Sequence, residues 1–316
     1  MVHSDPDSRL AQSADALPLS AARREAGILS DCSDYLELTK PRITVFILMS
    51  TAIGFMCGQH IAGHWSWMQL FHTLLGTALI ASGTAALNQW YERAADAKMI
   101  RTKKRPIPDG RVAARRAFAF GLALSIVGFV ELCRGVNLLT GLLGLFTLAS
   151  YLLIYTPLKQ KSPHSTTIGA IPGAMPPLIG YAAASGLLNW EAAVLYAILF
   201  LWQFPHFYAI AWMYRDDYAR AGIRMLPVVE PSNESTARRI VGMSLALIPI
   251  SLLPKFLSMA GNVYLYGALA LGLYFFYAGV RASRDRTPAR ARQVLLASIV
   301  YLPLLYGLLV FDGTRY

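Results

Sequence analysis

The chain has 316 residues, of which 55% are hydrophobic and only 15% are charged. This composition gives more apolar surface than one soluble core can bury, so it excludes an ordinary soluble domain and favours a membrane protein. The net charge of +11 would suit a nucleic-acid-binding protein only if the basic residues lay outside the loops that flank membrane spans.

Nine apolar segments are each long enough to cross about 30 Å of hydrocarbon as a helix. In chain order they are residues 43–62, 68–88, 116–133, 137–157, 166–186, 190–213, 237–254, 262–280 and 293–312. We expect residues 1–33 to be a flexible cytoplasmic tail and residues 34–316 to be one membrane domain. The predicted fold class is therefore all-α, a polytopic bundle of nine transmembrane helices.

The basic residues are distributed very unequally between the two sides of these spans. If the N-terminus is cytoplasmic, 26 of the 29 Lys and Arg residues lie on the cytoplasmic side. Because positive residues concentrate in cytoplasmic loops, this asymmetry predicts an N-in, C-out orientation and argues against a nucleic-acid partner. Acidic residues among the first fifteen are unlike a mitochondrial transit peptide, so a bacterial inner membrane is expected.

The second span runs into an acidic segment. If the helix continues, Asn88, Glu92 and Asp96 share one face, since they are spaced four residues apart. Carboxylates at this spacing repel one another, which suggests a neutralising Mg²⁺ that also binds substrate phosphates. A basic cluster suited to phosphate oxygens follows, made of Lys98, Arg101, Lys103, Lys104 and Arg105. The alternative is that the acids form helix salt bridges and the basic run anchors the topology.

A second acidic segment follows the span at 190–213. It contains Tyr214 and the adjacent Asp216 and Asp217. The predicted loops 89–115 and 214–237 lie on the same membrane face, so together they could hold one metal diphosphate. The alternative is an interfacial loop with an aromatic belt, which explains the tyrosines but not the aspartate pair.

Two further segments carry polar candidates. His206 lies near the end of an otherwise apolar helix, where a polar side chain suggests either a function or a helix-packing contact. Lys159 and His164 lie between the two acidic segments and are candidates for phosphate contact. The span at 166–186 is rich in Gly and Pro, which predicts a kinked or closely packed helix.

These segments together resemble the UbiA superfamily of intramembrane prenyltransferases. The spacing of Asn88, Glu92 and Asp96 matches its first acidic motif. The segments 38–42, 101–106, 155–159, 202–206 and 221–227 are similar to the protohaem IX farnesyltransferase branch. The resemblance covers about residues 34–312. The second motif departs from the superfamily pattern, because Met213 stands four residues before Asp217.

The resemblance implies a helical bundle whose central cavity is capped by cytoplasmic loops. It implies that farnesyl diphosphate ionises with Mg²⁺, and that a vinyl group of protohaem IX captures the farnesyl cation with addition of water, giving haem O. By position, the Mg²⁺ ligands would be Asn88, Glu92, Asp96 and Asp217, and Lys98, Arg101 and Arg105 would neutralise the diphosphate. His206 would face the haem as an axial ligand or orienting donor. Haem A synthase or terminal oxidase assembly is a further expected partner.

Three other functions remain open from the sequence. A related enzyme could prenylate a quinone or chlorophyll precursor with much the same acidic and basic residues. A transporter could use the acids as an ion path, although the charges concentrate at one membrane face. A non-enzymatic haem-holding scaffold would not need the acidic face at all. Release of diphosphate from farnesyl diphosphate separates the enzymes from the other two functions.

Overall fold

The computed structural model describes residues 32–63 and 65–313, so most of the predicted tail at 1–33 lies outside the described residues. Residues 32–38 form a short helix that precedes the first long one. The other helical elements are α2 (Pro41–Ala62), α3 (Trp67–Asp96), α4 (Ala114–Gly135), α5 (Leu138–Ala149), the π-helical turn η2 (Ser150–Tyr155), α6 (Thr156–Leu158), α7 (Ser165–Gly173), α8 (Met175–Ser185), α9 (Trp190–Met213), α10 (Arg215–Arg220), α11 (Leu226–Val229), α12 (Glu234–Phe256), α13 (Asn262–Arg284) and α14 (Pro288–Phe311).

The all-α prediction is confirmed, since the described residues form helices and a single isolated bridge, with no strand. Eight helical segments in this part of the chain are long and apolar enough to cross a membrane, counting α5 to α6 as one. They coincide with eight of the nine predicted spans. Large apolar side chains such as Leu153 and Phe311 are exposed on the outside of the bundle, as expected for a surface that faces lipid.

The predicted span at 166–186 is divided into two helices, so the structure does not reproduce it as one continuous element. Helix α7 ends at Gly173, and α8 begins at Met175 with prolines in its first turn. Pro176 and Pro177 have no backbone N–H, so they cannot bond to carbonyls one turn earlier, and they disfavour helical geometry in the residue before them. The predicted kink is thus confirmed, but neither half is long enough to span a bilayer alone.

Helix α8 packs very closely against α2. A Cβ atom on Gly54 would lie 2.0 Å from the carbonyl oxygen of Pro177, and one on Gly180 would lie 1.8 Å from that of Thr51. No side chain larger than hydrogen fits between these backbones. The close packing predicted from the small residues is therefore confirmed.

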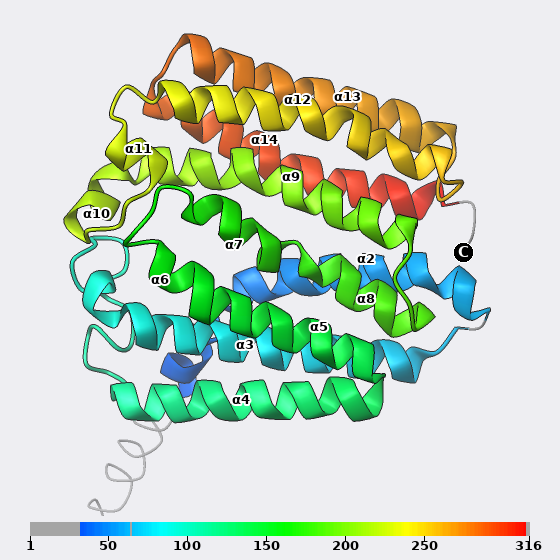
Figure 1. Ribbon diagram of the computed structural model, residues 1–316, viewed down its shortest axis with the longest axis horizontal. Helices are drawn as coiled ribbons and strands as arrows, with labels where there is room; N and C mark the ends of the chain where they lie inside the picture. Colours follow the sequence, from blue (N-terminus) through cyan, green and yellow to red (C-terminus); the bar gives the residue numbers. More distant parts are fainter. Residues whose placement is uncertain (1–31, 64, 314–316) are drawn as a thin grey trace, which may run out of the picture.

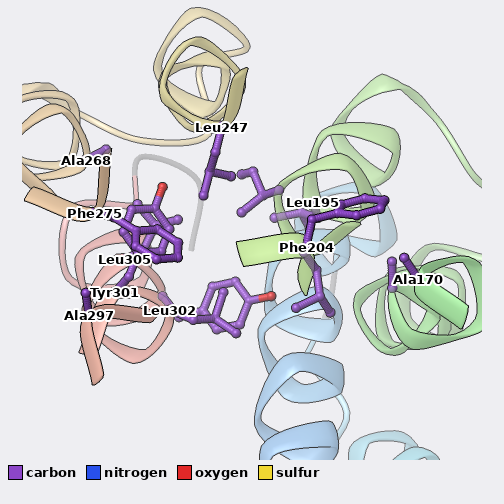
Figure 2. Close-up of a cluster of buried hydrophobic side chains, with 14 of the residues drawn as sticks. Ala170, Leu195, Phe204, Leu247, Ala268, Phe275, Ala297, Tyr301, Leu302 and Leu305 are labelled. Carbon is purple, nitrogen blue, oxygen red and sulfur yellow. The ribbon is translucent and has the colours of Figure 1, made fainter. Parts of the chain in front are cut away.

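The largest buried cluster joins the later helices of the chain. Figure 2 shows this cluster, with Leu195 and Phe204 of α9 between Ala170 of α7 on one side and Leu247 of α12, Phe275 of α13 and Tyr301 of α14 on the other. Dispersion contacts of this kind fix the position of α9 relative to α14. Both of these helices line the cavity described below.

The helices run roughly along one direction, and four connections lie at the left end in Figure 1. We call this the loop end; it contains residues 97–113, residues 159–164, the short helices α10 and α11, and residues 285–287. Helix α3 has 30 residues, or about 45 Å, which exceeds the hydrocarbon thickness. Its extra length carries the acidic segment to the loop end.

Candidate active site

Helix α3 stays helical through the whole acidic segment, as the spacing required. The amide of Asn88 donates a hydrogen bond to Oε2 of Glu92 at 3.0 Å, so the two side chains share one face. The same amide nitrogen lies 3.3 Å from the hydroxyl of Thr156. The predicted loop at 89–115 therefore begins as helix, and its irregular part is residues 97–113.

Glu92 is paired with a lysine from another segment of the chain. Lys159, directly after α6, donates from Nζ to Oε1 of Glu92 at 2.9 Å, and each side chain is 11% exposed. The ammonium also lies 4.5 Å from the ring centroid of Tyr155, a cation–π contact that further stabilises the buried charge. The sequence-based candidate Lys159 is thus brought to the acidic face.

Lys40 is a site residue that the sequence analysis did not single out. Its Nζ donates to Oδ1 of Asn88 at 3.3 Å, and its backbone has φ 51° and ψ 59°, directly before the proline that starts α2. A left-handed lysine is strained and concentrates at functional sites. Burial, reinforced by the positive charge of Arg105, lowers the pKa of Lys40 to about 7. The only sequence signal was the Lys-Pro pair before the first span.

Asp96 is fully buried at the end of α3. Its Oδ2 accepts a hydrogen bond from Nη1 of Arg105 at 2.7 Å. Its Oδ1 is buried and has no hydrogen-bond partner. A buried carboxylate oxygen without a donor is costly, so this atom is suited to a ligand that brings its own positive charge.

Asp217 of α10 joins the second acidic segment to the first. Its two carboxylate oxygens accept from the backbone N–H groups of Ile100 at 3.1 Å and Arg101 at 3.3 Å, and Arg220 also donates to it. Burial would raise the pKa of Asp217, but these three donors outweigh it and hold the pKa below its usual range. The two predicted loops are therefore in direct contact.

Two more contacts tighten the loop end. The guanidinium of Arg101 lies 4.9 Å from the ring centroid of Tyr214 and donates to the hydroxyl of Tyr218 at 3.4 Å. The backbone N–H of Arg224 donates to the carbonyl of Lys159 at 2.9 Å. These bonds link the segments after α3, α6 and α10 into one cap.

The remaining predicted residues lie on the outside of this cap. Asp216 is 82% exposed and contacts Arg215 at 3.5 Å. Exposed side chains without a contact to the acidic face belong to Lys98, Lys103, Lys104 and His164. They can meet an anion arriving from water, but the structure does not join them to Glu92 or Asp96.

An apolar cavity of about 520 Å³ extends into the bundle from the network formed by Lys40, Asn88, Glu92 and Lys159. Lys40 and Tyr151 line it near the loop end, and it continues between α2, α3, α5, α9 and α14. His206 lines its wall, where its Nδ1 lies 2.8 Å from Oγ of Ser298 and its ring stacks on Trp202 at 4.7 Å. A long apolar chain fits such a space when its charged end stays beside Lys40.

Within residues 32–63 and 65–313, no group of three or more His, Cys, Asp or Glu side chains converges closely enough to hold a metal ion alone. Mg²⁺ commonly uses one or two carboxylates and completes its shell with waters and substrate phosphates. The oxygens of Asn88 and Glu92 and the unpartnered Oδ1 of Asp96 fit that mode of binding.

Known proteins resemble this chain in sequence and in fold. A protein of Solibacter usitatus (strain Ellin6076) named protoheme IX farnesyltransferase is 63% identical over 286 residues, covering 88% of this chain and 98% of that protein. A digeranylgeranylglyceryl phosphate synthase structure has a TM-score of 0.75 at 16% identity, covering 89% and 98% of the two chains. A UbiA homolog from Archaeoglobus fulgidus bound to GPP and Mg²⁺ has a TM-score of 0.61 at 16% identity, covering 88% and 99%.

The two solved structures show the fold, and the sequence match shows the family. Residues 47–302 match the UbiA prenyltransferase family. This range contains both acidic segments and most of the residues that line the cavity. With eight membrane-length apolar helices among its described residues, the chain is a multi-pass membrane protein that belongs to the UbiA prenyltransferase family.

Proposed function

We propose that this chain transfers the farnesyl group of farnesyl diphosphate to a vinyl group of protohaem IX, with addition of water, and so produces haem O and diphosphate. The observation that carries the proposal is the joined network of Lys40, Asn88, Glu92 and Lys159 at the head of an apolar cavity. An anion binds at the network and a prenyl chain in the cavity. The name of the Solibacter usitatus relative supports farnesyl as the donor and protohaem as the acceptor.

The reaction breaks the bond between C1 of the farnesyl group and the diphosphate oxygen, and the electron pair leaves with the diphosphate. The vinyl group supplies the electron pair for the new carbon–carbon bond. Water adds to the other vinyl carbon and releases one proton. The main task of the protein is to stabilise the negative charge that grows on the leaving group. Lys40 at the cavity and Arg105 beside Asp96 would supply positive charge for this task, and Arg101 of the cap would add to it.

Mg²⁺ is the cofactor we assign to this site. Asn88, Glu92 and Asp96 would hold it, since Oδ1 of Asp96 lacks a donor and the other two present oxygens on the same helix. When bound, Mg²⁺ supplies positive charge that neutralises the diphosphate. The Archaeoglobus fulgidus homolog, which was solved with GPP and Mg²⁺, supports this assignment.

Asp217 stays a predicted ligand of the metal diphosphate. Its oxygens already accept from two backbone N–H groups, which supports an additional role in shaping the loop after α3. A carboxylate has about four acceptor positions, so these bonds leave room for a cation.

The location of the protein is also a proposal. The excess of Lys and Arg at the loop end supports an N-in, C-out chain with the active site on the cytoplasmic side, and the acidic residues among the first fifteen support a bacterial inner membrane. An association with haem A synthase or terminal oxidase assembly stays a prediction.

The test is to incubate the purified protein in lipid with haem B, farnesyl diphosphate and Mg²⁺, and to analyse the extracted haem by mass spectrometry. The expected product is a hydroxyfarnesylated haem, formed only with Mg²⁺, with one diphosphate released per haem modified. If diphosphate is released while haem stays unmodified, and a quinone precursor supplied instead becomes prenylated, the acceptor is the quinone precursor and not haem. Folded protein that releases no diphosphate would contradict the enzyme and favour a transporter or scaffold.

A further inference from the structure

One buried serine organises the polar wall of the cavity. Ser298 of α14 is fully buried, and two rings of α9 dock on it. The indole Nε1 of Trp202 donates to the backbone carbonyl of Ser298 at 2.8 Å, while Nδ1 of His206 lies 2.8 Å from its Oγ. The rings are nearly parallel, with an interplanar angle of 24°. Ser298 therefore orients the imidazole in two ways. Its Oγ contacts Nδ1 directly, and its carbonyl holds the indole on which the imidazole stacks.

The hydrogen bonds also determine which ring nitrogen carries the proton. The hydroxyl of Ser298 has one hydrogen, and its Oγ lies 2.6 Å from the carbonyl oxygen of Leu295, which can only accept. Without that hydrogen between them the two oxygens would repel at this distance, so the hydroxyl donates to Leu295. Oγ then acts as an acceptor toward His206, which requires a proton on Nδ1.

The other ring nitrogen is then a free electron-pair donor. A neutral imidazole protonated at Nδ1 has its lone pair on Nε2. No residue in the described part of the chain forms a hydrogen bond with Nε2 of His206, and the residue lines the cavity. A neutral histidine whose other nitrogen donates to a fixed acceptor is the usual arrangement of a metal-ligating histidine.

The depth of His206 suits an acceptor that meets the prenyl chain. His206 precedes the end of α9 at Met213 by seven residues, and Asn88 precedes the end of α3 at Asp96 by eight. At 1.5 Å per residue, each lies about 10–12 Å from the end of its own helix. His206 lines the cavity, and so does Lys40, which donates to Asn88 of the diphosphate-binding face.

We propose that Ser298 is a positioning residue that holds His206 in its Nδ1-protonated form and presents Nε2 to the cavity as an axial ligand for the haem iron. This inference rests on the proposed function, since it takes protohaem as the acceptor. An acceptor on Nδ1–H raises the basicity of the imidazole and strengthens its bond to iron.

The first experiment measures haem binding without farnesyl diphosphate, so it does not depend on turnover. Absorption titration gives the haem affinity, and resonance Raman spectra of the ferrous complex give the iron–histidine stretching band. His206→Ala should lose the band. Ser298→Ala should weaken haem binding about tenfold and shift the band to lower frequency, while Ser298→Thr restores both. Ser244→Ala is the matched control, because Ser244 is buried in α12 and donates only to carbonyls of its own helix.

A chemical rescue keeps the test decisive where Ser298→Ala folds poorly. In His206→Gly, imidazole should restore the iron–nitrogen band at lower concentration than 1-methylimidazole, which has no N–H to donate to Ser298. The preference should vanish when Ser298→Ala is added. Equal rescue by both ligands in His206→Gly would overturn the role of Ser298.

The remaining outcomes separate this inference from the proposed function. If haem bound to His206→Ala keeps the iron–histidine band, ligation by His206 is overturned, even if haem O is formed. Loss of that band in His206→Ala with no change in Ser298→Ala would overturn the positioning role alone. Failure of the wild-type protein to bind haem, together with transfer of the prenyl group to another acceptor and release of diphosphate, would overturn the haem acceptor and this inference together.

Discussion

The two ends of the bundle each contain a glutamate with little exposure, and the surroundings of these two glutamates differ. At the loop end, Glu92 pairs with Lys159 and accepts from Asn88, which in turn is held by Lys40. At the opposite end, Glu191 lies in the first turn of α9 and accepts from Tyr181 at 2.8 Å, and Nε2 of His60 lies 3.0 Å from its carboxylate. Figure 1 shows the start of α9 far from the loop end.

The difference lies in charge balance and in access to the cavity. At the loop end, Lys40, Lys159 and Arg105 face two carboxylates, and one oxygen of Asp96 has no donor. The lining of the cavity includes Lys40 but none of Glu191, Tyr181 and His60. A buried excess of cations beside a cavity indicates an anion site. A cluster without such an excess, away from the cavity, indicates structural contacts that hold α2, α8 and α9 together.

The largest expected effect is that of Asp96→Asn. It removes the buried charge that we assign to Mg²⁺, so turnover should fall about 1000-fold while farnesyl diphosphate still reaches the cavity. The measurement is diphosphate release over a Mg²⁺ titration. Asp285→Asn is the control, because Asp285 is an exposed acid of the loop end that pairs with Arg290. Activity of Asp96→Asn within a factor of two of that control would contradict the metal site.

Arg105→Ala should lower turnover about 100-fold, because it removes a cation of the cap and leaves Asp96 without its partner. Membrane insertion should not change, since many other basic residues maintain the topology. Membrane fractionation and an activity assay on the same preparation separate the two effects. Arg238→Ala provides the control at an arginine that is 70% exposed, and misinsertion of Arg105→Ala alone would undermine the catalytic interpretation.

Glu92→Gln and Glu191→Gln test the comparison directly. The first should lower turnover at least about tenfold, since it removes a charge that we assign to Mg²⁺ and leaves Lys159 without its carboxylate. The second should leave turnover near that of the wild type and lower stability by about 1–3 kcal/mol, because it weakens the bonds to Tyr181 and His60. Turnover and thermal unfolding are measured on both variants. A loss of turnover in Glu191→Gln without unfolding would mean that the opposite end takes part in the reaction.

The smallest effect is a pH dependence of substrate binding. With its pKa lowered to about 7, Lys40 is charged below pH 7 and neutral above it, and an anion binds the charged form. The affinity for farnesyl diphosphate should therefore fall about fivefold between pH 7 and pH 8, beyond any change due to the diphosphate itself. Lys40→Arg stays charged and should lack this part of the slope. Parallel binding curves for the two proteins would exclude Lys40 as the titrating group.

Much of the fold follows from the sequence because lipid imposes simple requirements. Every backbone polar group in hydrocarbon must be satisfied within its own segment, so length and hydropathy indicate helices. Nine spans were predicted this way, and eight of them coincide with membrane-length helices in the described part of the chain. The prolines predicted only a kink where the structure has a break between α7 and α8. Whether the two half-helices separate depends on their packing against α2 and α9.

The composition of the acidic face could also be predicted, because Asn88 and Glu92 are neighbours on a single helix. Residue spacing could not place Lys40 beside Asn88, Lys159 beside Glu92, or Ser298 beside His206, which are separated by 48, 67 and 92 positions. Such contacts arise from the packing of whole helices and from the connections between them. The sequence by itself determined a helical membrane protein with an acidic face. Only the tertiary structure decided which cations surround that face and which hydroxyl orients the histidine in the cavity.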